Sequence, residues 1–405
     1  MIKIHKEVIN QVAFYALVAA LPLNLGYHFM LKQAYVRGLL IDYLLPTLYI
    51  QDILAVILVL SNLDILKKNL GKIDKYLVWF LFAVFLSVLS SVHLVSSAAA
   101  YGRLALYILV MLCIKYKYKQ ADILGTVVNI FSLLVVLLSL LAFLQWYGQG
   151  SVFDNYLFFG EQPYSVATPG INIESFLGEA KVPAYGTFRH PNVFGGILSI
   201  LLIWLLFSAK ERGLSKMALV LGTIALVFTL SFFAWTSFLL GLIFYFMFRS
   251  KNRFKYHTVL VITGLAVLLA VLLPYIPRVG EFAEKPSYYR RANLLYNSYR
   301  VVSTRPLFGV GYGVSSAYMD KFYPPAKDAR FAQPPHNIFV LLLAESGCFA
   351  LLFFTLFIFK SLKSAVRNPM LFISLAQAVF LGMFDHYFFT IHQTQLLFWV
   401  ILGFL

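Results

Sequence analysis

The segment QPPHNIFVLLLAESG, residues 333–347, places a histidine between a double proline and an apolar run. The ordinary pKa of imidazole lies near neutral pH, so His336 could take a proton from a substrate hydroxyl group. Asn337 follows it and belongs to the residue types that cap helix starts. The positive end of the helix dipole there would disfavour the imidazolium and favour the neutral base. The plainer alternative is an interfacial histidine that is hydrogen-bonded to water.

A second segment, YGTFRHPNVFGGILS at residues 185–199, has the same design. Arg189 and His190 stand directly before Pro191, which suits the first position of a helix, and an apolar run follows. The pattern fits a simple helix cap as well as a substrate-binding role. We therefore treat Arg189 and His190 as candidate substrate-binding residues and test the helix start separately.

A third segment, GMFDHYFFTIHQTQ at residues 382–395, carries Asp385, His386 and His392 between two apolar runs. An ionisable side chain beside a membrane span is costly, and its presence there is a hint of function. An aromatic turn at the membrane surface is the alternative interpretation. Asp385 and His386 join the candidate substrate-binding residues, as does Asn337 of the first segment.

A basic segment, RRANLLYNSYRVVSTRPLFGVGYG, occupies residues 290–313. Its Arg291, Leu294 and Ser298 fall at helical spacing, which predicts an amphipathic helix at the membrane surface. Guanidinium groups match phosphate oxygens in a two-bonded geometry, so an anionic ligand would account for the arginines. Arg291 is the first candidate ligand for such a phosphate, and Arg290 and Arg305 are further candidates. A solvated basic helix is the alternative.

The composition shows which elements must position these residues. The chain has 405 residues, of which 60% are hydrophobic and 12% charged, and its mean hydropathy is +0.79. A soluble domain cannot bury that much apolar surface, so we predict one all-α polytopic domain over residues 1–405 in a lipid bilayer. Runs of about 17–25 apolar residues cross a bilayer. Twelve runs qualify, and the first is interpreted as an uncleaved helix: 10–31, 45–62, 76–93, 99–115, 123–147, 191–208, 216–231, 233–248, 257–275, 337–359, 369–385 and 388–405.

The net charge of +16 follows the expected membrane topology. More than half of the 33 Lys and Arg residues fall in short loops on one side, which makes that side cytoplasmic and places both termini there. The basic balance is therefore no sign of nucleic-acid binding. Two long segments, 148–190 and 276–336, fall on the outer side, and loops of that length are usually functional.

Several functional classes are disfavoured by the sequence. GVGYG at residues 309–313 resembles a potassium-channel filter but lacks a spanning helix directly behind it. The same glycines have no strand before them, which argues against a dinucleotide site, and no nucleotide-binding GK[ST] loop or HExxH metal motif occurs. The two cysteines, Cys113 and Cys348, lie in separate spans and indicate neither a disulfide framework nor a thiolate metal site.

Taken together, these segments resemble the O-antigen ligase and polymerase superfamily of bacterial membrane glycosyltransferases. The resemblance covers most of the chain and is strongest over residues 120–400. It is carried by GTFRHPNVFGG, by PPHNIFVLLLAESG, and by Arg291, fifteen residues before Pro306 in RPLFGVGYG. Within it, His336 matches the catalytic histidine and Arg291 the arginine of the external loop.

The resemblance implies a GT-C-like helical fold in the cytoplasmic membrane with the active site on the outer face. It implies a polyprenyl diphosphate-linked glycan donor, such as an undecaprenyl diphosphate derivative, and no cofactor or metal. The acceptor hydroxyl would belong to lipid A–core in a ligase, for lipopolysaccharide synthesis, or to a second lipid-linked glycan in a polymerase. We adopt the ligase as the leading hypothesis, with the polymerase as the alternative and a polysaccharide or solute transporter as a second alternative.

One position departs from the family pattern. Many members have a Ser-Arg pair at the turn between the seventh and eighth spans, but here Ser231 is followed by Phe232. A phosphate clamp of two arginines therefore does not carry over intact. Our hypothesis is that Arg189 supplies the missing guanidinium, with Arg290 or Arg305 as the fallback.

Overall fold

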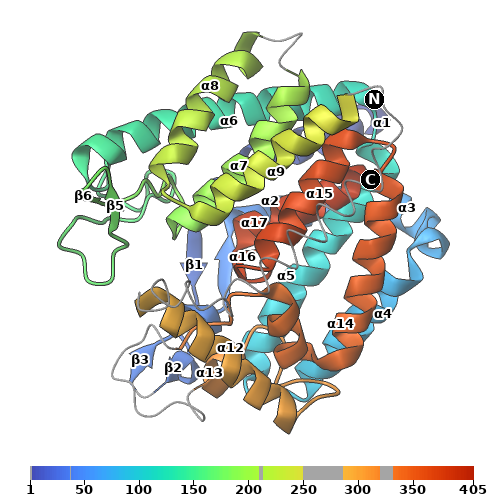
Figure 1. Cartoon of the computed structure of the whole chain (residues 1–405). Coiled ribbons are helices and arrows are strands. Elements are labelled where there is room, and N and C mark those ends of the chain that lie inside the picture. The colour runs from blue at the N-terminus through green and yellow to red at the C-terminus, as the bar shows by residue number, and fades with distance from the viewer. Residues whose placement is uncertain (1, 37, 209–212, 250–285, 320–331) are drawn as a thin grey trace.

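The computed structural model describes residues 2–36, 38–208, 213–249, 286–319 and 332–405, and it is mostly helical (Figure 1). The expected span 257–275 lies outside the described residues. The helices of the first half are α1 (Ile2–Ala19), α2 (Ile50–Ser61), α3 (Leu63–Lys68), α4 (Lys75–Leu89), α5 (Leu94–Cys113) and α6 (Ala121–Gly148). Those that follow are α7 (Pro191–Ser208), α8 (Gly213–Phe228), α9 (Phe232–Arg249), α12 (Pro286–Thr304), α13 (Ser315–Met319), α14 (Ile338–Ala365), α15 (Pro369–Gly382), α16 (Tyr387–Thr390) and α17 (His392–Phe404).

The helices agree with a membrane protein. Five of those described are long and apolar enough to cross a bilayer: Leu94–Tyr118, Asp122–Gly148, Pro191–Ser208, Phe232–Arg249 and Ile338–Ala365. Five shorter apolar helices lie beside them: Glu7–Ala19, Ile50–Ser61, Lys75–Leu89, Gly213–Phe228 and Pro369–Gly382. The structure thus supports an all-α membrane protein, whereas the twelve spans and the GT-C-like fold remain expectations.

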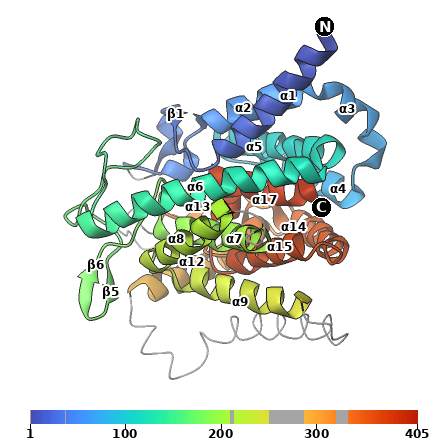
Figure 2. The ribbon, with the colours of Figure 1, turned by 90° about the horizontal axis from the view of Figure 1, so that it is seen from above.

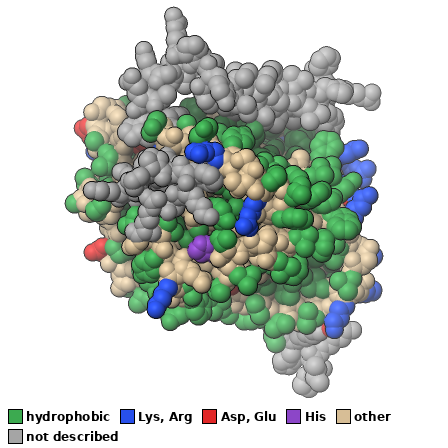
Figure 3. Space-filling model, turned by 90° about the horizontal axis from the view of Figure 1, so that it is seen from below, with side chains coloured by type: hydrophobic (Ala, Val, Ile, Leu, Met, Phe, Trp, Pro, Cys, Tyr) green, Lys and Arg blue, Asp and Glu red, His purple; other side chains and the backbone are tan. Residues whose placement is uncertain are grey.

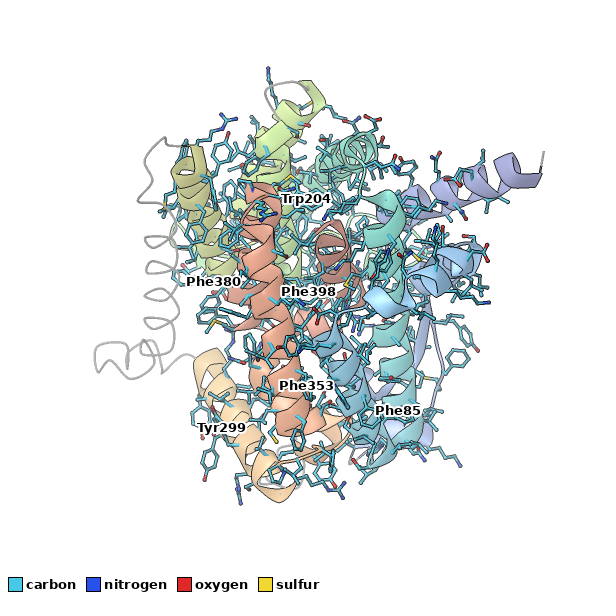
Figure 4. All side chains as sticks on the ribbon, turned by 90° about the vertical axis from the view of Figure 1, so that its right-hand side faces the viewer. Phe85, Trp204, Tyr299, Phe353, Phe380 and Phe398 are labelled. Atoms are coloured by element: carbon cyan, nitrogen blue, oxygen red, sulfur yellow. The ribbon has the colours of Figure 1, made fainter. Side chains whose placement is uncertain are left out.

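The core is built around α17, whose residues are all buried, including its polar first turn. A helix that is apolar nearly all round requires neighbours on every side, and α17 packs against α5, α15 and α16. Seen from above, α1 and α2 lie at one edge of the molecule and α9 at the opposite edge (Figure 2). Aromatic side chains are spread along the length of the bundle, as Trp204, Phe380, Phe398 and Phe353 show (Figure 4).

The first expected span, 10–31, is placed wrongly in its second half. Helix α1 ends at Ala19, and the chain continues through Pro22, which cannot extend a helix, into strand β1 (Gly26–His28). Gln51 donates from Nε2 to the carbonyl oxygens of Ala20 and Leu23, at 2.7 and 2.6 Å, and so satisfies the end of α1. Residues beyond α1 therefore leave the helix instead of completing a longer one.

Residues 24–49 form a small subdomain that we call the β1–β4 cap. Strand β1 pairs antiparallel with β4 (Thr47–Tyr49), and a second hairpin joins β2 (Tyr35–Val36) to β3 (Leu39–Leu40). Short helical turns η1 (Lys32–Ala34) and η2 (Asp42–Leu44) connect them. Buried Ala34, Ile41 and Leu44 pack with Val314, which follows the Gly-rich segment. A third hairpin, β5 (Glu174–Phe176) with β6 (Glu179–Lys181), lies in the segment 148–190.

Both chain ends lie at one end of the bundle, and α12 and α13 lie at the other (Figure 1). We call the end with α12 and α13 the site end. The expected amphipathic helix is confirmed as α12, with Leu294 and Ser298 fully buried and Tyr299 and Arg300 exposed. Figure 3 views the site end and shows Lys and Arg side chains and a histidine among hydrophobic ones.

Helix α14 is interrupted at Gly347, whose φ of 78° lies in the left-handed region. A Cβ at this position would come within 2.0 Å of the carbonyl oxygen of Leu307, so glycine is required both for its backbone angle and for space. The Gly-rich segment fills the break: Val310 N donates to Ala344 O at 3.1 Å, and Cys348 N to Pro306 O at 2.9 Å. The two motifs RPLFGVGYG and ESG are thus one structural unit.

Candidate active site

His336 is held at the site end by the start of α14. Asn337 is the N-cap: its Oδ1 accepts from Phe339 N at 2.9 Å and from Val340 N at 3.1 Å. Its Nδ2 donates to the carbonyl oxygen of Met383 at 3.0 Å, just beyond α15. The expected cap is confirmed. Oδ1 of Asn337 caps α14, and Nδ2 joins this helix start to the residue that follows α15.

His336 and Asp385 form a hydrogen-bonded pair. The distance from His336 Nδ1 to Asp385 Oδ1 is 3.2 Å, and the two side chains are 18% and 13% exposed. An ionised carboxylate can only accept a hydrogen bond, so Nδ1 carries the proton and Nε2 keeps its lone pair. Asp385 Oδ1 also accepts from the backbone N–H of His386 at 2.8 Å, which fixes the carboxylate. The imidazole is therefore oriented and set in the tautomer that a general base needs.

His386 packs beside the His336–Asp385 pair. Its ring centroid lies 4.9 Å from that of His336, and its Nδ1 is 2.7 Å from Thr390 Oγ1. The ring of Tyr43, from the β1–β4 cap, lies nearly perpendicular to that of His386, with the centroids 5.5 Å apart. His386 is thus enclosed, and burial is the largest effect that lowers its pKa, to about 3, against the opposing charge of Asp385.

The charges around the pair favour a neutral base and an ionised acid. Burial is the main cause that lowers the pKa of His336; Asp385 opposes it, and Arg291 and Arg290 add to it. Burial alone would raise the pKa of Asp385, but His336, His386 and Arg291 hold it well below its ordinary range. His336 is thus available as a proton acceptor at neutral pH.

Arg291 reaches the pair from α12 and rests on an aromatic stack. Its Cζ lies 5.6 Å from the ring centroid of Phe233, and Phe233 stacks on Phe384 at 4.1 Å with an interplanar angle of 12°. Phe384 directly precedes Asp385, so the stack connects the guanidinium to the carboxylate through adjacent residues. A guanidinium held by its face keeps its N–H edge for an oxyanion.

His190 also belongs to this neighbourhood. Its Nδ1 accepts from Asn192 N at 3.1 Å, at the start of α7, where Pro191 occupies the first position as expected. His190 is partly exposed to solvent, but protein surrounds most of its ring. This loss of water around the ring is the largest cause that lowers its pKa, to about 4. Arg291 and Arg290 lower the pKa of His190 as well, while Asp385 opposes them.

Two of the expected arginines have other partners. Arg189 forms an ion pair with Asp42 at 3.6 Å and donates from Nη2 to the hydroxyl oxygen of Tyr49 at 3.2 Å. Arg305 donates from Nη1 to the carbonyl oxygen of Ser90 at 2.8 Å, at the end of α4. Of the candidates for a second phosphate ligand, Arg290 is therefore the one that shares the electrostatic neighbourhood of His336.

His336, Asp385 and His386 also fit the description of a metal-binding group, because their ligand atoms lie within 4.8 Å of one another. Imidazole nitrogen with carboxylate oxygen is a donor set that several divalent metals accept. However, Arg291 acts electrostatically on all three residues and opposes a second positive charge among them. The expectation of a metal-free site is tested below.

Two residues at the site, Tyr43 and Phe233, could not be identified from the sequence. Tyr43 comes from the β1–β4 cap, a region interpreted as the end of one span and a short connection. Phe233 follows Phe232, which stands where many family members have an arginine and is 64% exposed. His392 was noted with Asp385, but it lies apart from the pair and stacks on Tyr49 at 3.5 Å.

The fold and the site define a helical membrane protein with a histidine–carboxylate pair and arginines gathered at one end. Residues 217–355 match the family model described as O-antigen ligase, and this segment includes both Arg291 and His336. The match, over about a third of the chain, confirms the resemblance to the O-antigen ligase and polymerase superfamily. No curated protein matches the chain. Arg189, His190, Asp385 and His386 lie outside the matched segment.

Proposed function

We propose that this protein is an O-antigen ligase-like glycosyltransferase that moves a glycan from a polyprenyl diphosphate carrier to an acceptor hydroxyl. The observation that carries the proposal is the His336–Asp385 pair at 3.2 Å, with Arg291 beside it, at the end of a membrane bundle. The family match supports glycan transfer in the broad sense. The carrier, the acceptor and the membrane side are part of the proposal.

Each residue has a chemical role in this reaction. His336 Nε2 takes the proton of the acceptor hydroxyl while the oxygen forms a bond to the anomeric carbon. The bond from that carbon to the diphosphate breaks, and the polyprenyl diphosphate leaves with the bonding electron pair. Arg291, with Arg290 near it, binds the charge that develops on the diphosphate; a well-placed donor of this kind contributes about 3–4 kcal/mol to the transition state. Asp385 holds His336 in its tautomer and stabilises the imidazolium.

The membrane arrangement completes the proposal. Twelve spans of a GT-C-like fold, with both termini in the cytoplasm, would place the site end on the outer face of a bacterial cytoplasmic membrane. The alternative of a polymerase uses the same residues with a second lipid-linked glycan as acceptor. A transporter would also need the charged residues but would form no glycosidic bond.

The first experiment compares the lipid-linked glycans of cells with and without this protein. Loss of a ligase leaves long glycans on the polyprenyl diphosphate carrier, whereas loss of a polymerase leaves single repeat units. Complementation with His336→Gln should fail, by a factor of roughly 10²–10⁴ in transfer rate for the loss of a general base. His93→Gln, at the start of α5, is the matched control and should complement. An unchanged glycan profile on deletion would reject the enzyme and favour the transporter.

A further inference from the structure

A second polar cluster lies at the site end, between the β1–β4 cap and the start of α7. It consists of Asp42 and Tyr43 in η2 and of Arg189, which directly precedes His190. The Arg189–Asp42 ion pair is open on its acidic side: the side chain of Asp42 is 63% exposed and that of Arg189 21%. The second terminal nitrogen of Arg189, Nη2, donates to the hydroxyl oxygen of Tyr49, whereas Nη1 faces Asp42. The cluster is thus ordered by protein contacts and still accessible.

The cluster is adjacent to the catalytic pair through Tyr43 and His386. The ring of Tyr43 lies nearly perpendicular to that of His386, and the charges of Arg189, Asp385 and Asp42 all act on the phenol of Tyr43. Arg291, in contrast, is among the charges that act on His336, Asp385 and His386. Arg291 thus acts on the pair from α12, and Arg189, before α7, is connected to it through Tyr43.

The chemistry of this cluster does not suit a phosphate. A diphosphate approaching Arg189 would meet the carboxylate of Asp42 at the same guanidinium, and like charges at close range repel. A sugar presents the opposite case, because each hydroxyl both donates and accepts hydrogen bonds. The carboxylate accepts, the guanidinium donates, and the apolar ring of Tyr43 offers contact to sugar C–H groups. A net-neutral pair beside a tyrosine is therefore suited to a polyhydroxylated group.

We propose that Asp42, Tyr43 and Arg189 form the acceptor subsite, where they bind the sugar that carries the attacking hydroxyl and hold it against His336. This inference rests on the proposed glycan transfer and assigns Arg189 a role different from the phosphate ligand expected from the sequence. The donor diphosphate is then bound by Arg290 and Arg291, and the acceptor sugar approaches His336 past Tyr43.

The β1–β4 cap gives the subsite a fixed position. Leu44, the last residue of η2, is fully buried in the small core shared with Val314. Ser96 of α5 donates to the carbonyl oxygen of Leu44 at 2.6 Å. On the other side, Thr187 donates to the carbonyl oxygen of Pro22 at 2.5 Å, two residues before Arg189. Asp42 and Arg189 are therefore held in place by different parts of the bundle, which come together at the Arg189–Asp42 ion pair.

The test measures steady-state transfer by the full-length protein in lipid nanodiscs, with Asp42→Asn and Arg189→Gln. The donor is a polyprenyl diphosphate-linked glycan, and the acceptor probes are purified lipid A–core and, separately, a single lipid-linked repeat. The acceptor subsite predicts that each variant raises the KM for the acceptor at least tenfold and changes the KM for the donor by less than twofold. Arg300→Gln, on the exposed face of α12 at the same end, is the control and should leave both KM values unchanged.

The variant Asp42→Asn distinguishes the two possible roles of Arg189 by the direction in which the KM values change. If Arg189 binds the diphosphate, removal of the competing carboxylate lowers the KM for the donor, and the acceptor-subsite inference is overturned. Normal KM values for both substrates in both variants would overturn it as well. Absence of transfer by the wild-type protein with either acceptor probe would instead reject the proposed function. Correct folding of each variant is checked by its thermal unfolding temperature against that of Arg300→Gln.

Discussion

At the scale of single residues, the charges around His336 act in opposite directions on its pKa. Asp385 raises the pKa of the imidazole, and Arg291 lowers it, while burial keeps it below its ordinary value. Transfer that depends on the neutral base is complete above this pKa and is lost as the pH falls through it. The position of the acid limb in a pH–rate profile therefore reports the charges at this site.

We expect opposite shifts from two substitutions. Asp385→Asn removes the charge that raises the pKa of His336, so the acid limb of kcat/KM should move to lower pH. Arg291→Gln removes a charge that lowers this pKa, so the limb should move to higher pH. The profiles are measured from pH 4.5 to 8 with the donor varied. Shifts in the same direction for both variants would show that the titrating group is not His336.

The ligand-like group formed by His336, Asp385 and His386 gives a second prediction at this scale. Because Arg291 opposes a cation there, transfer should stay within twofold after dialysis against EDTA. The assay uses the protein in nanodiscs, with the dialysed sample compared before and after addition of Mg²⁺, Mn²⁺ or Zn²⁺. A loss of activity that one of these ions restores would instead show that the three residues hold a catalytic metal.

At the scale of elements, the break in α14 joins the helix that carries His336 to the segment that follows Arg291. Glu345 is buried beside the break; its Oε2 accepts from Gly313 N at 2.9 Å. Its Oε1 accepts from Ser315 N at 3.2 Å and from Ser315 Oγ at 2.8 Å. One side chain of α14 thus fixes the loop that leads from α12 into α13.

Glu345→Gln should therefore destabilise the protein. The amide nitrogen of glutamine cannot accept, so at least one buried N–H group loses its partner, at a cost of about 1–3 kcal/mol. We expect a lower thermal unfolding temperature in detergent. Ser316→Ala is the matched control: the hydroxyl of Ser316 is buried nearby, with no hydrogen-bond partner among the described residues, so its loss should change little. Equal unfolding temperatures for wild type and Glu345→Gln would contradict the assigned role.

Local signals explain which elements could be predicted from the sequence. The 3.6-residue spacing of Leu294 and Ser298 identified α12, and the residue types of Pro191 and Asn337 identified two helix starts. The break at Gly347 could not be found in this way, because its cause is the segment at Leu307, distant in the sequence. The β1–β4 cap was missed for a related reason: its short apolar strands have the composition of a membrane span.

The same distinction between local signals and distant contacts applies to the residues of the candidate site. His336, Arg291 and Asp385 were identified from residue type and from their places beside apolar runs, and the structure brings all three together. The sequence carries no distances, so it did not pair His336 with Asp385 or separate Arg189 and Arg305 from them. Tyr43 and Phe233 act through contacts with distant segments, and an aromatic residue in an apolar chain gives no local sign of such a contact.

At the scale of the whole molecule, the proposed orientation places the β5–β6 hairpin outside the cell and the loop after α3 inside. Leu177 at the tip of the hairpin is 91% exposed, and Lys68 at the end of α3 is also exposed. A membrane-impermeant maleimide applied to intact spheroplasts should label Leu177→Cys and leave Lys68→Cys unlabelled until the membrane is opened. The wild type, with buried Cys113 and half-buried Cys348, gives the background. The reverse labelling pattern would invert the proposed topology and place the site end in the cytoplasm.

The order of the chain adds a consequence of the bond between Asn337 and Met383. During synthesis, Phe233, Arg291 and His336 emerge from the ribosome before α15, and Asp385 emerges after it. In the proposed membrane arrangement, the nascent protein therefore contains a histidine without its carboxylate until α15 has crossed the bilayer. Because Asn337 and His336 each bond to residues just beyond α15, correct insertion of this one helix both closes the bundle and completes the base. For the proposed transferase in the proposed arrangement, catalytic competence therefore depends on the completion of membrane insertion.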